Sequence, residues 1–498
     1  MRKRAGNIAS LCRKGNFIAA IRLLSLKNGG YPGCARIINR LDDAFLIFLG
    51  RFMASVIRTR FAPSPTGFLH VGNVRTALIC WLFTRSQKGD FFLRLDDTDF
   101  ERSEERFALG IQDDLKWLGL NLDGIERQSD RFPRYEEIKQ QLIALGRLYP
   151  CYESSEELEI KRKIQLSRGL PPIYDRAALR LSDAEKANFE KEGRTPHWRF
   201  RLDETKKISW HDLIKGEVVF DAANLSDPVV IRANGQPTYL LPSAVDDMDM
   251  KITHIVRGED HVTNTAIQLQ MFEAMGASAP QCAHLALIKS KEGKISKREG
   301  GFDIMSLREA GIEPMTICSV LARVGTSQPI VACTKLEQLV QGFDFGIFSR
   351  SAAQYDFSEL ETFNAKIIQR YDYSEIKSHL QTKNLQNLDE NFWLAVRGNL
   401  NRFDEIAEWW KICREKIEIQ HEDADFLKQA AELLPDEPWG ADTWSIWIEK
   451  LKTATGRKGK MLFMPLRLAL TGAEHGPELQ VILPLIGRKM AMERLGVE

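Results

Sequence analysis

The stretch Arg-Phe-Ala-Pro-Ser-Pro-Thr-Gly-Phe-Leu-His-Val-Gly-Asn, residues 60–73, carries the strongest fold signal in this chain. It begins inside a strand-like run, Val56 to Phe61, and its prolines and glycine indicate a turn. From His70 onward, apolar residues recur at helical spacing: Val74, Ala77, Leu78 and Trp81. A strand that turns directly into a helix presents the helix N-terminus, where backbone N–H groups and the helix dipole favour a phosphate. The stretch therefore predicts a nucleotide-binding α/β domain in which His70 touches the phosphates and Gly72 leaves room for the ligand.

A second motif, Lys289-Ser-Lys-Glu-Gly-Lys-Ile-Ser-Lys-Arg-Glu-Gly-Gly301, reads as a basic loop flanked by glycines. A run of lysines by itself is often only a solvated surface loop. Downstream of a His-x-Gly helix start, however, Lys294 and Lys297 can neutralise the β- and γ-phosphates of a nucleotide as pyrophosphate leaves. Together the two motifs resemble the HIGH and KMSKS signatures of class I aminoacyl-tRNA synthetases.

More specific pieces of the sequence resemble the glutamyl-tRNA synthetases, and this resemblance runs over residues 55–498. The pieces are Arg-Phe-Ala-Pro-Ser-Pro-Thr-Gly (60–67), Leu-Arg-Leu-Asp-Asp-Thr-Asp (93–99), Gly-Gln-Pro-Thr-Tyr (235–239), Val-Asp-Asp (245–247), Ile-Val-Arg-Gly-Glu-Asp-His (255–261) and the segment 456–478. Glutaminyl enzymes, the nearest relatives, carry Pro-Glu-Pro-Asn-Gly in the first motif and a β-barrel in the C-terminal half. This chain has Pro-Ser-Pro-Thr-Gly and a tail with a helical pattern.

The resemblance implies an α/β fold of the class I synthetase type. We expect a Rossmann-type, doubly wound parallel sheet with an acceptor-end insertion domain, followed by an all-α anticodon-binding domain. The expected domains are a basic N-terminal extension (1–52), the first half of the sheet (53–131), an acceptor-binding insertion (132–238), the second half of the sheet with the lysine loop (239–302), a helical stem-contact domain (303–370) and an α-helical anticodon-binding domain (371–498).

Members of this family ligate L-glutamate to tRNA-Glu through a glutamyl-adenylate made from ATP. Neither step needs a protein nucleophile, so positioning and charge neutralisation provide most of the catalysis. By match to the family, the expected catalytic residues are His70, Lys294 and Lys297, with Mg²⁺ sharing the phosphate charge. The expected ATP-binding residues are His70, Gly72, Asn73, Lys294, Ser296 and Lys297.

Selection of glutamate requires a fixed cation for the side-chain carboxylate. Arg60 is the prime candidate, because arginine binds a carboxylate bidentately and stays charged, and Asp96 is expected to take the substrate ammonium group. The expected glutamate-binding residues are Arg60, Ala62, Ser64, Asp96, Tyr239, Ser243 and Arg257. Asp96 stands where glutamate is frequent in the family and Ser243 where asparagine is common, so both side chains reach less far. Taken singly, Arg60 could instead form a surface salt bridge and Tyr239 a core contact.

Three other functions remain open from the sequence. A non-discriminating enzyme also or mainly glutamylates tRNA-Gln, and the active site does not reveal the difference because it depends on reading an anticodon base. A truncated relative attaches glutamate to a modified base within tRNA, but it lacks an anticodon-binding domain, and the tail at 456–479 argues against it. A degenerate synthetase kept as an RNA-binding or scaffold protein is expected to lose His70 or Lys297, and both are present.

The 498-residue chain has a net charge of +1 that conceals an asymmetry. Residues 1–52 contain ten basic and two acidic residues, so the remainder is acidic overall and has to gather its basic side chains on one face to hold a tRNA. Residues 1–52 fit a transit-like peptide, an RNA-contacting extension or upstream codons translated in error. Met53, just before the first strand, favours the third interpretation.

The eight cysteines include no Cys-x-x-Cys pair, which indicates free thiols in a reducing, cytoplasmic compartment. Some members of the family carry a zinc knuckle in the insertion. At the corresponding place this chain has the single thiol Cys151, so no structural zinc is expected. No apolar run approaches the length of a membrane span, and a monomer is the default that the family implies.

Overall fold

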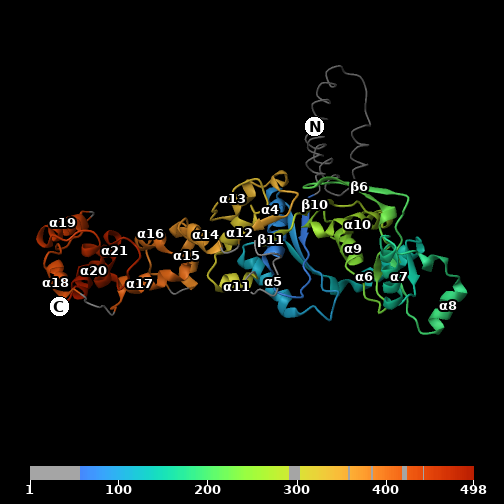
Figure 1. The fold of residues 1–498 in the computed structure, drawn as a ribbon, viewed down its shortest axis with the longest axis horizontal. Coiled ribbons are helices and arrows are strands. Elements are labelled where there is room, and N and C mark those ends of the chain that lie inside the picture. Colours follow the sequence, from blue (N-terminus) through green and yellow to red (C-terminus); the bar gives the residue numbers. More distant parts are fainter. Residues whose placement is uncertain are drawn as a thin grey trace, which may run out of the picture. The chain divides into compact units, whose positions relative to one another are not determined.

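A parallel sheet is the central element of the structure, a computed structural model that describes residues 56–290, 303–356, 359–382, 385–417, 423–440 and 442–497 (Figure 1). The first set of strands runs in the order β1 (Arg58–Phe61), β2 (Asp90–Leu95) and β3 (Gly124–Arg127), all parallel. The second set runs in the order β7 (Gly216–Asp221), β6 (Lys207–Asp212), β10 (Gln281–Leu285) and β9 (His254–Gly258), with only β7 antiparallel to its neighbour.

The two sets of strands meet at β1 and β9. The backbone N–H of Thr253 donates to the carbonyl of Arg58 at 2.9 Å, and the N–H of Arg58 donates to Thr253 Oγ1 at 2.8 Å. The chain therefore winds one way from β1 to β3 and the other way from β9 onward, which places the topological switch point between β1 and β9. This confirms the doubly wound parallel sheet expected from the sequence.

Helix α4 (Val71–Ser86) follows the proline-rich turn and packs on β1, β2 and β9. The residues that the sequence assigns to one helical face, Val74, Ala77, Leu78 and Trp81, are all buried. After the helix the chain returns toward β1 through Gly89, where a Cβ atom would lie 2.2 Å from the carbonyl oxygen of Ile57. Only glycine allows this close approach, which sets the start of β2 beside β1.

Further helices that lie before the lysine loop include α5 (Glu105–Trp117), α6 (Phe132–Ala144), α9 (Leu240–Asp249) and α10 (Val262–Ala274). The sequence pattern places the second half of the sheet from Tyr239 onward, but Tyr239 instead begins α9, and the next strand, β9, starts at His254. The helix forms because Leu241, Ala244 and Val245 are buried on one face against the neighbouring hydrophobic cluster.

The insertion contains a small antiparallel sheet in the order β4 (Leu148–Cys151), β5 (His197–Phe200) and β8 (Val229–Ile231). Two further helices, α7 (Ser155–Ser167) and α8 (Asp183–Lys191), bury none of their residues. Both begin with a capping box, Ser154 with Glu157 and Ser182 with Glu185, which satisfies the first backbone N–H groups without tertiary contacts.

After the lysine loop the chain is mostly helical. It forms α11 (Ile304–Glu309), α12 (Pro314–Leu321), α13 (Leu336–Gln341) and α14 (Leu360–Ile368), while β11 (Ile288–Ser290) and β12 (Ala353–Tyr355) make a short parallel pair. The C-terminal helices, orange to red in Figure 1, are α15 (Tyr373–Thr382), α16 (Glu390–Val396), α17 (Ile406–Arg414), α18 (Ala424–Glu432), α19 (Thr443–Thr455), α20 (Lys460–Thr471), α21 (Leu479–Ile486) and α22 (Arg488–Arg494). The all-α C-terminal part expected from the sequence is thereby confirmed.

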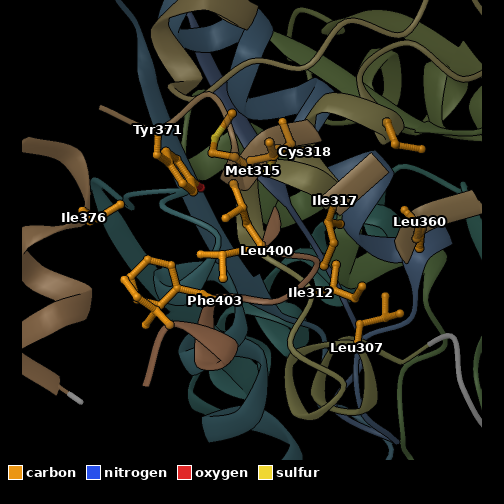
Figure 2. Close-up of a cluster of buried hydrophobic side chains, with 14 of the residues drawn as sticks. Leu307, Ile312, Met315, Ile317, Cys318, Leu360, Tyr371, Ile376, Leu400 and Phe403 are labelled. Carbon is orange, nitrogen blue, oxygen red and sulfur yellow. The ribbon is translucent and has the colours of Figure 1, made fainter. Parts of the chain in front are cut away.

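One hydrophobic cluster runs from the sheet into the C-terminal helices. Figure 2 shows part of it, where Met315 and Cys318 of α12 lie together with Tyr371, Leu400 and Phe403 from the following segment. The helices after the lysine loop and the first C-terminal helices therefore share a core.

Among the described residues, no helix is both long and apolar enough to cross a membrane. The six cysteines in this part of the chain, Cys80, Cys151, Cys282, Cys318, Cys333 and Cys413, are all free thiols.

Candidate active site

A cavity of about 680 Å³ opens at the carboxyl ends of β1, β9 and β10. This is the switch point of the sheet, where open α/β folds bind their ligands. The cavity is lined by most of the site residues expected from the sequence: Arg60, Ala62, Ser64, His70, Gly72, Asn73, Tyr239 and Arg257. Segments more than 150 residues apart in the chain therefore converge on one pocket.

His70 caps the first turn of α4. Its Nδ1 accepts hydrogen bonds from the backbone N–H groups of Gly72 at 3.1 Å and Asn73 at 3.4 Å. A Cβ atom at residue 72 would lie 2.9 Å from Cε1 of the ring, so the glycine makes room for this histidine as well as for a ligand. The His70 side chain therefore caps two of the backbone N–H groups that the helix N-terminus would otherwise offer to a phosphate. Because Nδ1 accepts, a neutral ring carries its proton on Nε2.

Arg60 lines the cavity and is anchored from behind by a buried aspartate. Its Nε and Nη2 donate to the two oxygens of Asp247, at 2.8 and 3.2 Å, and Arg94 donates to the same carboxylate at 2.7 Å. Burial alone would raise the pKa of Asp247, but the two guanidinium groups outweigh it and hold that pKa below its ordinary value. Asp247 therefore fixes the direction of Arg60 toward the cavity.

Asp96 and Ser243 do not line the larger cavity. Both oxygens of Asp96 accept from Arg94, at 2.7 and 3.2 Å, and Ser243 Oγ accepts from Arg94 Nη2 at 3.1 Å. Burial raises the pKa of Asp96 above its ordinary value, while the charge of Arg94 works against this shift. Asp96 instead lines a neighbouring cavity of about 280 Å³, which shares Ser64 and Tyr239 with the larger one.

Arg257 also lines the larger cavity, and its guanidinium group is held by hydrogen bonds to neutral side chains. Its Nη1 donates to the Tyr239 hydroxyl at 3.1 Å, and its Nη2 donates to Gln268 Oε1 at 2.9 Å and to Thr265 Oγ1. Among the described residues no carboxylate forms an ion pair with Arg257, although it is only 5 % exposed. A buried cation without a counter-ion favours an anionic ligand.

Lys294, Ser296 and Lys297 lie outside the described residues, as does the extension 1–52. The described residues on either side of the lysine loop do reach the cavity. Lys289 lines it, and beyond the loop Asp303 forms a backbone bridge with His70 while the N–H of Ile304 donates to the carbonyl of Leu69 at 3.0 Å.

Several residues at the site were not assigned a role from the sequence. His261 and Asp260 line the cavity, and they belong to the quoted segment 255–261. Arg94 and Asp247 also lie inside quoted segments, 93–99 and 245–247, so the family resemblance carried the signal that could have found them. No local sequence pattern indicates which of these charges pair.

Three potential metal ligands approach within 4.8 Å of one another in the insertion: Cys151, Glu153 and His197. Their surroundings disfavour a cation. Lys161 and the Tyr174 hydroxyl already donate to Glu153 Oε1, burial raises the pKa of Cys151 to about 12, and the positive charge of Arg199 acts on His197 and repels a cation there. Three ligands are also fewer than a structural zinc requires. The absence of structural zinc stays a prediction that metal analysis of the purified protein tests.

Comparison with known families shows the family of this chain and agrees with its fold. The family described as "tRNA synthetases class I (E and Q), catalytic domain" matches residues 56–362, and the "Anticodon binding domain" family matches residues 372–497. This chain belongs to the class I tRNA synthetases. Its motifs at 60–73 and 289–301 are therefore those of a synthetase, as the resemblance implied.

The relatives of this synthetase agree with that assignment. The glutamate–tRNA ligase 1 of Rickettsia felis is 50% identical over 442 residues, which cover 88% of this chain and 99% of the relative. The glutamate–tRNA ligase 1 of Rhizorhabdus wittichii is 52% identical over 442 residues, with the same coverage. A crystal structure of a glutamate tRNA ligase from Elizabethkingia meningosepticum, in complex with its amino acid, superposes with a TM-score of 0.74 at 28% identity and covers 88% of this chain and 98% of its own.

Proposed function

We propose that this chain ligates L-glutamate to tRNA-Glu through a glutamyl-adenylate formed from ATP. The observation that carries the proposal is one cavity at the switch point that is lined both by a histidine-capped helix start and by the two buried arginines Arg60 and Arg257. Such a cavity can hold a nucleotide and a small dicarboxylic amino acid in contact, which is the geometry that adenylate formation requires. The relatives named glutamate–tRNA ligase support the choice of amino acid.

The nucleotide end of the cavity is the part around α4. ATP enters as its Mg²⁺ complex, and Nε2–H of His70 can donate to a phosphate oxygen while Gly72 and Asn73 line the same wall. Lys294, Ser296 and Lys297 are proposed to bind the β- and γ-phosphates, and the two lysines to neutralise the departing pyrophosphate. The placement of Lys289 and of the Asp303 bridge at the cavity supports this part of the proposal.

The amino-acid end is proposed to use Arg60 and Arg257 for the two carboxylates of glutamate. Ala62, Ser64 and Tyr239 line the space between the arginines and complete this part of the pocket. Asp96 is proposed to attract the substrate ammonium group from the neighbouring cavity, and Ser243 to act through Arg94 rather than by direct contact.

The smaller cavity is proposed to admit the acceptor end of tRNA. It opens beside the larger one at Ser64 and Tyr239, and the exposed arginines Arg102 and Arg232 line it, as a phosphate-rich strand requires. The active form is proposed to be a monomer, the default that the family implies. The free thiols support a cytoplasmic location.

The decisive experiment is charging of purified tRNA-Glu and tRNA-Gln, each separately, with labelled glutamate and ATP. Charging of tRNA-Glu alone supports the proposal in full. Charging of both tRNAs, or mainly of tRNA-Gln, assigns the enzyme to the non-discriminating class instead. If neither tRNA is charged, the proposed reaction is wrong.

The role of the lysine loop has its own test. Lys297→Ala is expected to lower pyrophosphate exchange, measured with tRNA present, by orders of magnitude while tRNA binding survives. Lys116→Ala on the exposed face of α5, outside the insertion and the lysine loop, is the matched control and is expected to leave exchange unchanged. An unchanged exchange rate in the first variant removes Lys297 from the mechanism.

A further inference from the structure

Behind Arg257, a line of buried polar side chains leads from the cavity to the insertion. Thr265, His284 and Asp212 are each at most 2 % exposed, and none of them lines the cavity. His284 lies on β10, whereas Asp212 is the last residue of β6, in the hairpin that the insertion contributes to the sheet. The line therefore joins a proposed substrate-binding residue to a distant segment of the chain.

Each step of this line is a hydrogen bond. Arg257 Nη2 donates to Thr265 Oγ1, which lies 2.8 Å from Nε2 of His284. Nε of Arg257 points to the same ring nitrogen at 3.4 Å. On the other side of the ring, Nδ1 of His284 lies 2.5 Å from Oδ2 of Asp212.

The chemistry of arginine fixes the direction of these bonds. A guanidinium group only donates, so Nε2 of His284 has to accept. The Thr265 hydroxyl accepts from Arg257, and its single hydrogen is assigned to Nε2 at 2.8 Å rather than to the carbonyl of His261, which is farther away at 3.4 Å. The ring proton is thereby assigned to Nδ1, which donates to Asp212. Burial and the charge of Arg257 lower the pKa of His284 although its bond to Asp212 works the other way, so the ring is neutral at neutral pH.

Asp212 is suited to hold this tautomer. Its Oδ1 accepts three backbone N–H groups, from Ile214 at 3.0 Å, Lys215 at 2.9 Å and His284 at 3.2 Å. Burial opposes its ionisation, but these bonds and the one from the His284 ring lower its pKa to about 2. Because Oδ1 is taken by three donors, Oδ2 is the oxygen left for the ring.

We infer that Asp212 and His284 are positioning residues for glutamate recognition: they hold the Arg257 guanidinium, through Thr265, in the orientation that binds a substrate carboxylate. The contacts of Arg257 use Nε–H, both hydrogens of Nη2 and one of Nη1, which leaves one Nη1 hydrogen beside Tyr239 for the ligand. This inference rests on the proposed function, because it assumes that Arg257 binds the amino acid.

The isosteric change Asp212→Asn is the sharpest test. The amide oxygen of the new side chain has to stay with the three backbone donors, so its NH₂ group faces Nδ1 and forces the ring proton onto Nε2, against two donors. The KM for glutamate is expected to rise about tenfold or more, as for loss of an orienting partner behind a ligand. The KM for ATP is expected to stay within about twofold of wild type. Asp221→Asn on the same hairpin, where the aspartate only caps Ala223, is the matched control and is expected to change neither constant.

A variant of His284 distinguishes a positioning role of Asp212 from a role in stability alone. His284→Gln places an amide oxygen where Nε2 accepts, and this acceptor has no tautomer to lose. In that background Asp212→Asn is expected to add less than about twofold to the KM for glutamate. If the full effect persists there, Asp212 does not act through the ring and the inference is overturned. It is equally overturned if Asp212→Asn raises both KM values together or leaves both unchanged.

Thr265 supplies a variant that does not touch the buried charges. Thr265→Val removes the hydroxyl at nearly constant shape and is expected to raise the KM for glutamate. Thr265→Ser keeps a hydroxyl at this position and is expected to keep the KM for glutamate near the wild-type value. This pair decides the matter even if Asp212→Asn does not fold. A wild-type protein that fails to charge any tRNA with glutamate overturns the proposed function, whereas normal wild-type charging with unaffected variants overturns only this inference.

Discussion

At the scale of single residues, the site is held by charges that never reach the solvent. Asp247 is 1 % exposed and accepts from both Arg60 and Arg94, and Asp96 is a second counter-ion of Arg94. A buried ion pair adds little net stability by itself. Removal of one partner is nevertheless strongly destabilising, because it leaves uncompensated charge in the interior.

Asp247→Asn is therefore expected to destabilise the protein by roughly 3–5 kcal/mol, since Arg60 stays buried without the carboxylate that it pairs with, while Arg94 keeps Asp96. Urea unfolding followed by circular dichroism measures this difference. Asp90→Asn breaks the half-exposed pair with Arg58 and is expected to cost less than about 1 kcal/mol. Equal losses in the two variants would contradict the role of burial.

Asp114 gives a pH-dependent case. Burial raises its pKa to about 6, above the ordinary 3.8, and Asp114 Oδ2 has no hydrogen-bond partner among the described residues. A raised pKa means that its contribution to stability is fully present below pH 3.8 and is lost as the pH rises through 6. The folded protein therefore bears the cost of a charged Asp114 at neutral pH.

Asp114→Asn is expected to make the protein more stable than wild type by about 1–2 kcal/mol at pH 8, with a smaller gap at pH 5. Denaturant unfolding at the two pH values measures the gap. Asp130→Asn, at an exposed carboxylate, is the control and is expected to show no such trend. A gap that is the same at both pH values would exclude burial as the cause.

At the scale of elements, the sequence predicted those parts of the site that depend on short motifs. The turn and helix start at 60–73 show in local residue types and spacing, and the cavity residues Arg60, His70 and Gly72 follow from them. Contacts between side chains from different segments are not visible in such local sequence patterns. Asp96 stays a predicted contact of the substrate ammonium, and the structure adds that both of its oxygens accept from Arg94, two residues away on the same segment, which the motif does not show.

The boundaries of some helices and strands follow from the local sequence pattern, whereas others depend on contacts with distant segments. The strand β1 and the helix α4 begin within two residues of the places expected from the sequence, because the strand-like run and the helical spacing are local patterns. The start of α9 was missed, because Tyr239 follows a strand-like segment and its helix is selected by burial against residues from other elements. Likewise, His284 lies in an ordinary strand pattern, and only the fold brings Asp212 to it.

The helices of the insertion differ in how they are held. Helix α6 buries Tyr135, Ile138 and Leu142, whereas α7 and α8 bury none of their residues and rely on their capping boxes. Hydrogen exchange followed by mass spectrometry is expected to show α7 and α8 exchanging at least about tenfold faster than α6, because local opening exposes no core there. Equal protection of the three helices would contradict this explanation.

At the scale of the whole molecule, the described helices after the lysine loop share a core with the sheet and with the first C-terminal helices. Asn364 on α14 ties the segments of this core together. Its Oδ1 accepts from the Glu313 N–H and the Thr316 hydroxyl, both at 2.8 Å, and its Nδ2 donates to the carbonyls of Gly311 and Asn401 at 3.1 and 2.9 Å.

Asn364→Ala is expected to lower the free energy of unfolding by about 3 kcal/mol, because two buried donors, the Glu313 N–H and the Thr316 hydroxyl, and two part-buried carbonyls lose their partner at once. Tryptophan fluorescence, which reports on the buried Trp393 and Trp447, and circular dichroism are expected to shift together. Asn399→Ala, at an exposed position, is the control and is expected to stay within about 0.5 kcal/mol of wild type. Separate transitions for the two signals would show that the shared core does not couple these parts.

The pairing of β6 with β10 has a consequence for how such a chain can change over generations. A hairpin whose first strand, β6, ends on Asp212 cannot be exchanged for that of a relative as an independent module, because Asp212 has to suit the histidine that β10 presents. Substitutions on the two strands are therefore expected to be inherited together. The insertion and the nucleotide fold would then descend as one unit rather than as interchangeable parts.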